Sequence, residues 1–316
     1  MSTPKYSIVA PVFNEAESLW EFHRRMRAVM DSLDGTAELL LVDDGSSDRS
    51  LQIMRQMQAT DESVRVLSFS RNFGHQVAIT AGMDHVHGAA VVVIDTDLQD
   101  PPEVIPHLVA EWKRGAELVL AVRASRRGET WFKRSTASVF YRLINRLTDL
   151  HIPKDSGDFR LMDRKVVEAI RQVREHHRFM RGLSVWVGFK RAEVEYVREE
   201  RFAGYSKYPL RSMLRFATDG ITSFSHVPLQ LAMTLGFVFA GVALLGIPAI
   251  VALRVSGSRE FSGQATTLVS VLLLGGIQLI CLGIVGEYLG RIYNEVKRRP
   301  LYLISGKWGF EGEPKE

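Results

Sequence analysis

Two long runs without a charged residue constrain this chain more than any other feature. Leu229–Leu253 and Ala265–Gly286 each exceed the roughly 20 residues that an α-helix needs to cross the apolar core of a bilayer. The segment between them is too short to form a domain, so the two runs predict a helical hairpin with both ends on one side of a membrane. The alternative is a pair of helices buried in a protein core, which the length and uniformity of both runs disfavour.

Basic residues are distributed unequally around this predicted hairpin. The segment between the runs holds Arg254 and Arg259. The flanks at the other end carry Arg211, Arg215, Arg291, Lys297, Arg298 and Arg299. The positive-inside rule therefore predicts a multi-pass protein of the inner (cell) membrane, with the N-terminal part and both termini in the cytoplasm. No long apolar segment follows a basic region at the N-terminus, so we expect no cleaved signal peptide.

The chain thus has a predicted organisation in five parts. These are a cytosolic domain at 1–207, a juxtamembrane amphipathic helix at 208–228, transmembrane helices at 229–253 and 265–290, and a cytosolic tail at 291–316. Within 208–228, apolar residues recur at helical spacing between Arg211, Arg215 and Asp219. That pattern is typical of a helix that lies on the inner leaflet.

Composition narrows the function classes. The formal charge of +4 and the pI of about 9.2 fit a protein that meets a membrane surface or handles phosphates. No zinc-finger, helix-turn-helix or RNA-binding signature is present in the sequence, so we expect no nucleic-acid partner. Cys281 is the single cysteine, which excludes an internal disulfide and a metal site built from thiolates.

The N-terminal part alternates short apolar runs with longer amphipathic ones. Strands are expected at 6–13, 37–42, 64–69, 90–94, 117–122, 156–162 and 194–198. Helices are expected at 17–33, 50–59, about 75–86, 102–114, 131–148, 165–173 and 178–187. This alternation predicts βαβ units and an α/β domain, with a mostly parallel sheet that helices cover on both faces.

Polar clusters follow four of the predicted strands. They are Asn14-Glu15, Asp43-Asp44, Arg71-Asn72 and the pair Asp95 and Asp97. The carboxyl ends of parallel strands share one edge of a sheet, and ligands bind there. We therefore expect one site at this edge.

The pair after the fourth strand has the chemistry of a metal site. In an extended chain Asp95 and Asp97 project on the same face, and Gln99 joins them if the chain stays extended. Two neighbouring carboxylates repel each other unless a cation lies between them, and Mg²⁺ or Mn²⁺ suits oxygen ligands and bridges to substrate phosphates. The alternative is that the two aspartates only end a strand.

Neighbouring residues have simpler interpretations. Asp100-Pro101-Pro102-Glu103 has the pattern of a helix start, so Asp100 is expected to cap a helix rather than to bind a ligand. Asn72 and His75 fit a helix cap as well as a ligand contact, and the lone His75 receives no catalytic role.

These motifs carry a resemblance. PVFNE (11–15), VDDGSSD (42–48) and DTD (95–97) have the order and spacing of family-2 nucleotide-sugar glycosyltransferases, which the chain resembles. SRNFGHQ (70–76), DTDLQDPPE (95–103), GDFRLMDR (157–164) and GEYLGRIY (286–293) are similar to the polyprenyl-phosphate glycosyltransferases. That group includes dolichol-phosphate mannose synthases and bactoprenol-phosphate glucosyltransferases. The similarity runs over almost the whole chain.

The resemblance implies a GT-A fold and inverting transfer of a hexose from a nucleotide-diphosphate sugar to a polyprenyl phosphate. GDFRLM and the two-span hairpin look most like the bactoprenol enzymes, so glucose from UDP-glucose is the expected donor. Mannose from GDP-mannose stays open, and so does a membrane scaffold that has lost activity. Relatives also imply a homo-oligomer, a tetramer. A processive polysaccharide synthase is disfavoured, because the sequence has no QxxRW-like motif.

Residue roles are carried over from the same resemblance. Asp97 is the expected metal ligand, Asp95 contacts the metal or the ribose, and Gln99 completes the site. Pro11 and Glu15 are expected to line the nucleoside pocket, with Asp43 or Asp44 accepting a hydrogen bond from the base. Phosphates are expected on Arg123, Arg134 and Ser138, and on a second set, Arg201 and Lys207. The alternative for these basic residues is a solvated loop or contact with anionic lipid headgroups.

Asp158 is the remaining carboxylate, and the resemblance implies that it lies near the acceptor phosphate or the sugar hydroxyls. A phosphate monoester has a second pKa near 6 and is mostly a dianion at pH 7, so it already acts as a nucleophile. We therefore expect Asp158 to orient a substrate rather than to abstract a proton.

Overall fold

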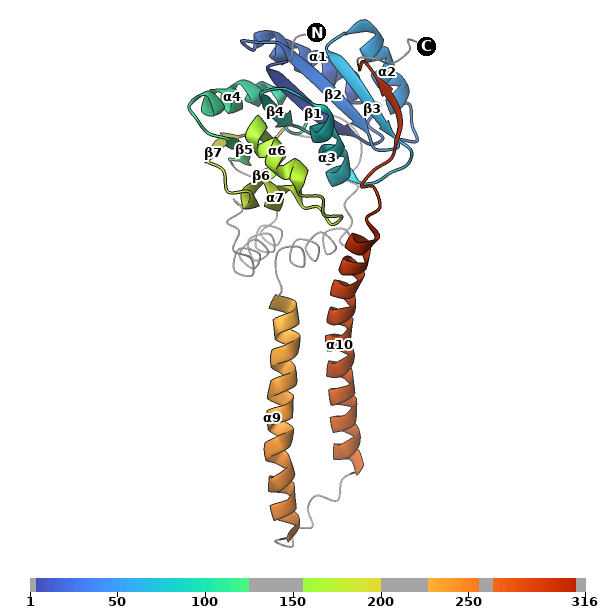
Figure 1. Cartoon of the computed structure of the whole chain (residues 1–316), viewed down its shortest axis with the longest axis vertical. Coiled ribbons are helices and arrows are strands. Elements are labelled where there is room, and N and C mark those ends of the chain that lie inside the picture. The colour runs from blue at the N-terminus through green and yellow to red at the C-terminus, as the bar shows by residue number, and fades with distance from the viewer. Residues whose placement is uncertain (1–3, 125–155, 200–226, 256–263, 311–316) are drawn as a thin grey trace. The chain divides into compact units, whose positions relative to one another are not determined.

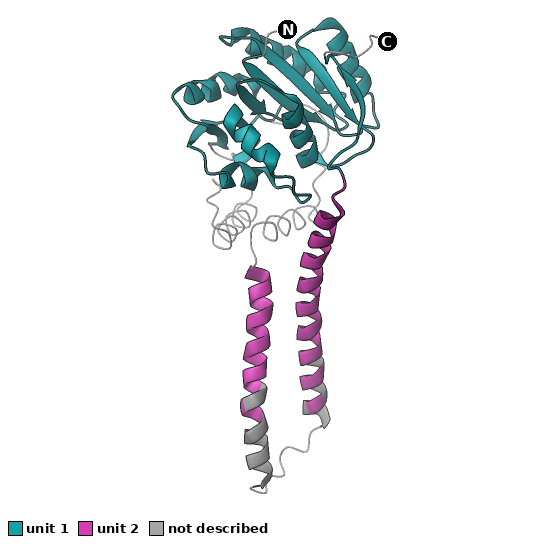
Figure 2. Cartoon of the chain, in the orientation of Figure 1, with its two compact units in different colours: residues 1–220, 300–316 teal, residues 221–299 magenta. Residues whose placement is uncertain are grey.

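The computed structural model of the chain describes residues 4–124, 156–199, 227–255 and 264–310. It divides into two compact units, one of residues 1–220 and 300–316 and one of residues 221–299 (Figure 2). The predicted helix at 131–148 and most of the predicted interfacial helix lie outside the described residues. Four predicted phosphate-binding residues also lie outside them, namely Arg134, Ser138, Arg201 and Lys207.

The described part of the first unit is built on an eight-stranded sheet in the order β7-β5-β6-β4-β1-β2-β3-β8 (Figure 1). Its strands are β1 (Tyr6–Val12), β2 (Ala37–Asp43), β3 (Val64–Phe69), β4 (Ala90–Val93), β5 (Leu118–Arg123), β6 (Ser156–Asp163), β7 (Arg191–Tyr196) and β8 (Ile304–Trp308). Strands β1 to β4 run parallel, as do β5 and β7. Antiparallel β6 lies between β4 and β5, and antiparallel β8 covers the outer edge of β3.

Helices cover both faces of this sheet. One group comprises α1 (Leu19–Ser32), α2 (Ser50–Thr60), the 3₁₀ turn η1 (Pro102–Val104) and α4 (Ile105–Lys113). The other comprises α3 (His75–His85), α6 (Arg164–Gln172) and α7 (Met180–Trp186). Alternation along β1 explains both layers, because Ile8 joins the core under α1 whereas Val9 packs so closely on α3 that a Cβ at Gly82 would clash with it. The predicted α/β class with a mostly parallel sheet is confirmed.

The second unit contains α9 (Val227–Val255) and α10 (Gln264–Lys297). The two helices contact each other, and the Cys281 thiol lies 3.8 Å from the carbonyl oxygen of Ala232. Within the described residues, Leu273–Lys297 is the one stretch long and apolar enough to cross a membrane, judged by length and composition, and Val227–Val242 is a shorter apolar helix. Two membrane crossings thus stay a prediction.

The C-terminal segment differs from the predicted tail at 291–316. Helix α10 continues to Lys297, and Ile304–Trp308 then pairs with β3 as strand β8. The pattern ISGKW is short and includes a glycine, so its alternation was too weak to mark a strand. Pairing with an open strand edge supplies the stabilisation that the local sequence lacks.

Candidate active site

The site is built first from the residues that follow β4. The Thr96 hydroxyl donates to the Pro11 carbonyl oxygen at 3.3 Å, which fixes this segment to β1. The backbone N–H of Gln99 donates to Asp97 Oδ1 at 3.1 Å, and Leu98 has φ 61°. The chain therefore turns at Asp97. The extended geometry from which a metal role was inferred for Gln99 is absent, and the metal role itself stays a prediction.

Strand β6 brings Asp158 to the same edge. The β4–β6 register pairs Val93 with Arg160, so the residues just beyond β4 lie opposite the start of β6. His75, the first residue of α3, lies between the two carboxylates. Its Nε2 is 3.5 Å from Asp95 Oδ1 and 3.4 Å from Asp158 Oδ2. The sequence left a helix cap and a ligand contact open for His75 and gave it no catalytic role. The structure places it at the site, and its position after the third polar cluster was the available signal.

Asp95 is in an environment that favours an additional cation. Burial raises its pKa to about 6, and the neighbouring Asp158, Asp100 and Asp97 add to this rise while His75 opposes it. Asp95 Oδ1 is buried and accepts no hydrogen bond from a described residue. Burial lowers the pKa of His75, but Asp95 and Asp158 outweigh burial and raise it to about 9. Asp95 therefore lies among other carboxylates and beside the cationic ring of His75.

These residues fit a divalent cation. No group of three or more His, Cys, Asp or Glu side chains that could hold a metal occurs in the part of the chain that the structure describes. A Mg²⁺ or Mn²⁺ ion at a nucleotide site needs fewer, since one or two carboxylates suffice when substrate phosphates and water complete the shell. Asp95 and Asp97 supply two carboxylates, and Asp95 Oδ1 accepts no hydrogen bond from a described residue, while His75 Nε2 lies 3.5 Å from it.

Asp158 is held in its ionised form. Arg181, from α7, donates to both of its oxygens, with Nε 3.1 Å from Oδ1 and Nη2 3.0 Å from Oδ2. Arg160 adds an ion pair at 3.6 Å and the Gln76 amide lies at 3.4 Å. Burial would raise the pKa of Asp158, but Arg181 and His75 together hold it well below its usual range. A carboxylate of this kind is a poor base and a good anchor, and Arg181 was missed from the sequence.

Asp100 does not cap a helix. The N-cap of η1 is Pro101, no side chain caps it, and Asp100 is 1% exposed. Its carboxylate instead accepts from the Tyr196 hydroxyl and lies 3.9 Å from Arg123 Nη2. The capping prediction was wrong because β7, distant in the sequence, brings Tyr196 beneath this turn. Arg123, at the end of β5, also lies 3.3 Å from the Tyr196 hydroxyl, so it is anchored beside the site.

The predicted donor-side carboxylates organise two loops. Asp43 Oδ1 accepts from the Ser46 N–H at 3.0 Å, and Asp44 Oδ1 accepts from the N–H of Phe73 at 2.7 Å and of Gly74 at 3.1 Å. Burial raises the pKa of Asp44, whereas these backbone bonds lower it. The loops after β2 and β3 are thereby joined. A contact from Asp43 or Asp44 to a base stays a prediction.

The segment after β1 completes this edge. Asn14 has φ 55°, and its Oδ1 accepts from the Ser47 N–H at 2.8 Å. The N–H of Glu15 donates to Ser50 Oγ at 3.0 Å, while Pro11 is buried inside β1. Pro11, Glu15, Asp43 and Asp44 thus belong to strands or loops that meet at the carboxyl edge of the sheet.

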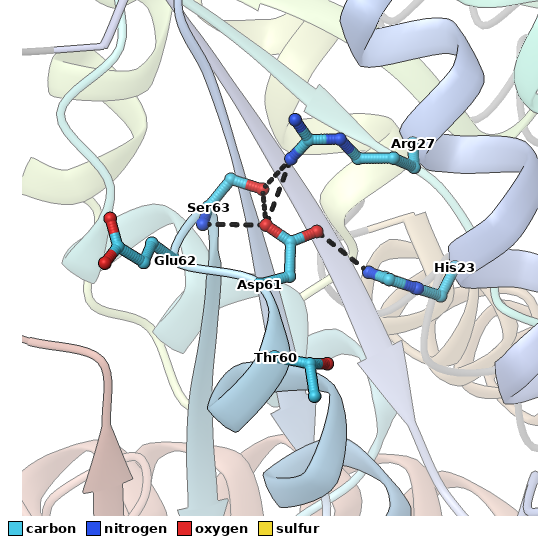
Figure 3. A pocket seen from close by; sticks show the side chains of 6 residues that line it. All are labelled: His23, Arg27, Thr60, Asp61, Glu62 and Ser63. Atoms are coloured by element: carbon cyan, nitrogen blue, oxygen red, sulfur yellow. Dashed lines mark hydrogen bonds and ion pairs between the residues drawn. The ribbon is translucent and has the colours of Figure 1, made fainter.

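A hollow of about 530 Å³ lies elsewhere in this unit, before the amino end of β3 (Figure 3). Asp61 is at its centre, with Arg27 Nη1 and His23 Nε2 each 3.0 Å from a carboxylate oxygen. The Ser63 hydroxyl donates to the same carboxylate at 2.6 Å. These polar atoms pair with one another, and none of the predicted site residues lines this hollow.

Known proteins with similar sequences and structures identify the family of this chain. Residues 7–171 match the family described as glycosyl transferase family 2. The uncharacterized glycosyltransferase YkcC of Bacillus subtilis is 50% identical over 98% of this chain and 96% of its own. The SfII prophage-derived bactoprenol glucosyl transferase of Shigella flexneri is 44% identical over 98% of this chain and 100% of its own. Among solved structures, glucosyl-3-phosphoglycerate synthase from Mycobacterium tuberculosis in complex with Mn²⁺, UDP and phosphoglyceric acid is similar. The alignment covers 68% of this chain and 75% of the synthase chain, with 19% sequence identity and a TM-score of 0.48.

Proposed function

Because the chain belongs to glycosyl transferase family 2 and is a glycosyltransferase with a GT-A fold, we propose that it transfers glucose from UDP-glucose to a polyprenyl phosphate such as undecaprenyl phosphate. The product would be a lipid-linked glucose that later steps of cell-envelope glycosylation use. The observation that carries this proposal is the 44% identity to a bactoprenol glucosyl transferase over nearly the full length of both chains.

The donor is proposed to bind at the carboxyl edge of the sheet. The loops of Asp43, Asp44 and Glu15 surround the nucleoside, and Asp95 and Asp97 hold Mg²⁺ or Mn²⁺ against the diphosphate. Bound there, the ion would supply positive charge next to the departing nucleotide. The buried Oδ1 of Asp95, which accepts no hydrogen bond from a described residue, supports this role.

The acceptor needs little activation, because its phosphate is already a dianion at pH 7. The main task is to align two anions that repel each other. Asp158 is held ionised by Arg181 and is therefore proposed to orient the sugar or the acceptor, with inversion at the anomeric carbon following from direct attack. Arg123 is proposed to contact phosphate, together with Arg134, Ser138, Arg201 and Lys207.

Polyprenyl phosphate lies in a membrane, which fits the apolar character of α10. We propose that α9 and α10 both cross the inner membrane and that the catalytic domain and both termini are cytoplasmic. The basic flanks of the two helices support this orientation. A tetramer, implied by resemblance, remains a prediction.

Incubating membranes that contain the protein with polyprenyl phosphate and labelled donor tests the proposal. With the wild-type protein and Mg²⁺ or Mn²⁺, labelled UDP-glucose should give a labelled lipid. The Asp97→Ala variant should give no labelled lipid under the same conditions. Labelling from GDP-mannose alone would instead identify a mannose synthase. If no donor labels lipid in any condition, the protein is a non-catalytic scaffold and the proposal fails.

A further inference from the structure

Strand β8 closes an edge of the sheet that would otherwise be open. Its pairing with β3 joins Val66 to Trp308 and Ser68 to Gly306, and the N–H of Ser70 extends the ladder by donating to the carbonyl oxygen of Leu303 at 3.0 Å. The register shifts between Ser68 and Phe69, close to the carboxyl end of β3. Two chains of contacts run from this point toward the donor-side loops.

The first chain of contacts is made of hydrogen bonds. Ser305 Oγ donates to the carbonyl oxygen of Ser68 at 3.2 Å and lies 3.3 Å from Ser68 Oγ. Ser68 Oγ in turn donates to Asp43 Oδ2 at 2.8 Å, and the other oxygen of Asp43 accepts from the Ser46 N–H. Ser68 is 2% exposed and Asp43 is 1% exposed, so water does not compete for the bond between them, whereas Ser305 itself is exposed. The C-terminal strand is thereby connected to the loop after β2.

The second chain of contacts is aromatic. The Tyr302 ring stacks on Phe69 with centroids 5.3 Å apart, and its hydroxyl donates to Asp84 in α3 at 2.9 Å. Phe69 meets the edge of Phe73 at 5.6 Å. The N–H of Phe73 donates to Asp44 at 2.7 Å. This series of contacts ends in the loop after β3, which is joined to the loop after β2 by the bond between Phe73 and Asp44.

We propose that the C-terminal segment 302–305 is a positioning element for the nucleotide sugar. By fixing β3 where it ends, Tyr302 and Ser305 order the loops 43–48 and 71–74, which bind the donor in the proposed function on which this inference rests. Both residues act through Asp43, Asp44 and the backbone, and neither touches the donor. The strand that directly follows α10 in the chain is therefore required for donor binding.

Ser305→Ala and Tyr302→Leu, each in the full-length protein, test this role. Hydrogen–deuterium exchange of the protein without ligands should show faster exchange at the amides of Ser46, Phe73 and Gly74. Losing one partly buried hydrogen bond or ring contact corresponds to a rise of about 2- to 10-fold. The KM for UDP-glucose should rise by a similar factor, and the KM for polyprenyl phosphate should stay unchanged.

Ser63→Ala is the matched control, since it also removes a serine hydroxyl that hydrogen-bonds next to β3, in this case to Asp61, but at the opposite end of the strand (Figure 3). It should lower the melting temperature without changing exchange in either loop. If Ser305→Ala leaves exchange or the donor KM at the wild-type value, β8 only covers an edge and the inference is overturned. If wild-type protein does not use UDP-glucose, the proposed function fails, while the exchange measurement still decides whether β8 orders the loops.

Discussion

Replacing Arg181 by Met isolates the ion pair that holds Asp158. Removing one partner of a buried ion pair costs about 3–5 kcal/mol. Asp158 is 5% exposed and Arg181 is 23% exposed, and the variant still offers His75 at 3.4 Å and Arg160 at 3.6 Å to the carboxylate. We therefore expect a loss of stability below that range, about 2–3 kcal/mol. At about 2–4 °C per kcal/mol for a domain of this size, the melting temperature should fall by about 4–12 °C.

Arg174→Met is the matched control for this measurement. Arg174 also makes a two-oxygen ion pair, to Asp84 at 2.8 and 2.9 Å, but its side chain is 49% exposed. An exposed pair contributes at most about 1 kcal/mol, so the melting temperature should fall by less than about 4 °C. Thermal unfolding of the purified full-length protein, followed by tryptophan fluorescence, measures both variants.

The activity of the same variants tests whether the ion pair also serves the reaction. A misoriented Asp158 should lower kcat by about 10- to 100-fold in Arg181→Met and leave it unchanged in Arg174→Met. Adding Asp158→Asn to Arg181→Met removes the carboxylate that lost this partner and should restore part of the stability but not the activity. Equal melting temperatures for Arg181→Met and Arg174→Met, with wild-type kcat in both, would refute the reasoning.

Three further predictions concern the site. Asp97→Ala, or removal of divalent ions with a chelator, should abolish sugar transfer in an activity assay. Without divalent ions, the melting temperature measured by fluorescence should change little. Gly45→Ala should destabilise the protein by more than about 1 kcal/mol, because Gly45 has φ 69° and its new Cβ would lie 2.5 Å from the backbone carbon of Arg71; a denaturation curve measures this. Tyr196→Phe removes a hydrogen bond from the buried carboxylate of Asp100 and should cost about 1–3 kcal/mol in the same assay.

The sequence was sufficient for the layers of the fold and for the edge that carries the site. Apolar runs marked most of the strands, and polar residues after β1 to β4 marked the carboxyl edge. The prediction that Gln99 projects on the same face as Asp95 and Asp97 assumed an extended chain. Leu98 instead adopts a positive φ, which no local sequence pattern indicates. Pairings across long sequence separations were also invisible. Antiparallel β6 brings Asp158 to Asp95, and β7 brings Tyr196 to Asp100, which changes Asp100 from an expected cap into a buried anchor.

The distribution of charge explains why separate groups are needed for the donor and the acceptor. Arg181 and Arg160 are paired with Asp158, and Arg123 is anchored by Tyr196 and Asp100. These cations therefore neutralise carboxylates before any substrate arrives. A diphosphate that approaches Asp95 and Asp97 meets two carboxylates that repel it, and an added divalent cation would offset that repulsion. The acceptor phosphate likewise requires basic groups beyond this cluster, which is the role proposed for Arg134, Arg201 and Lys207.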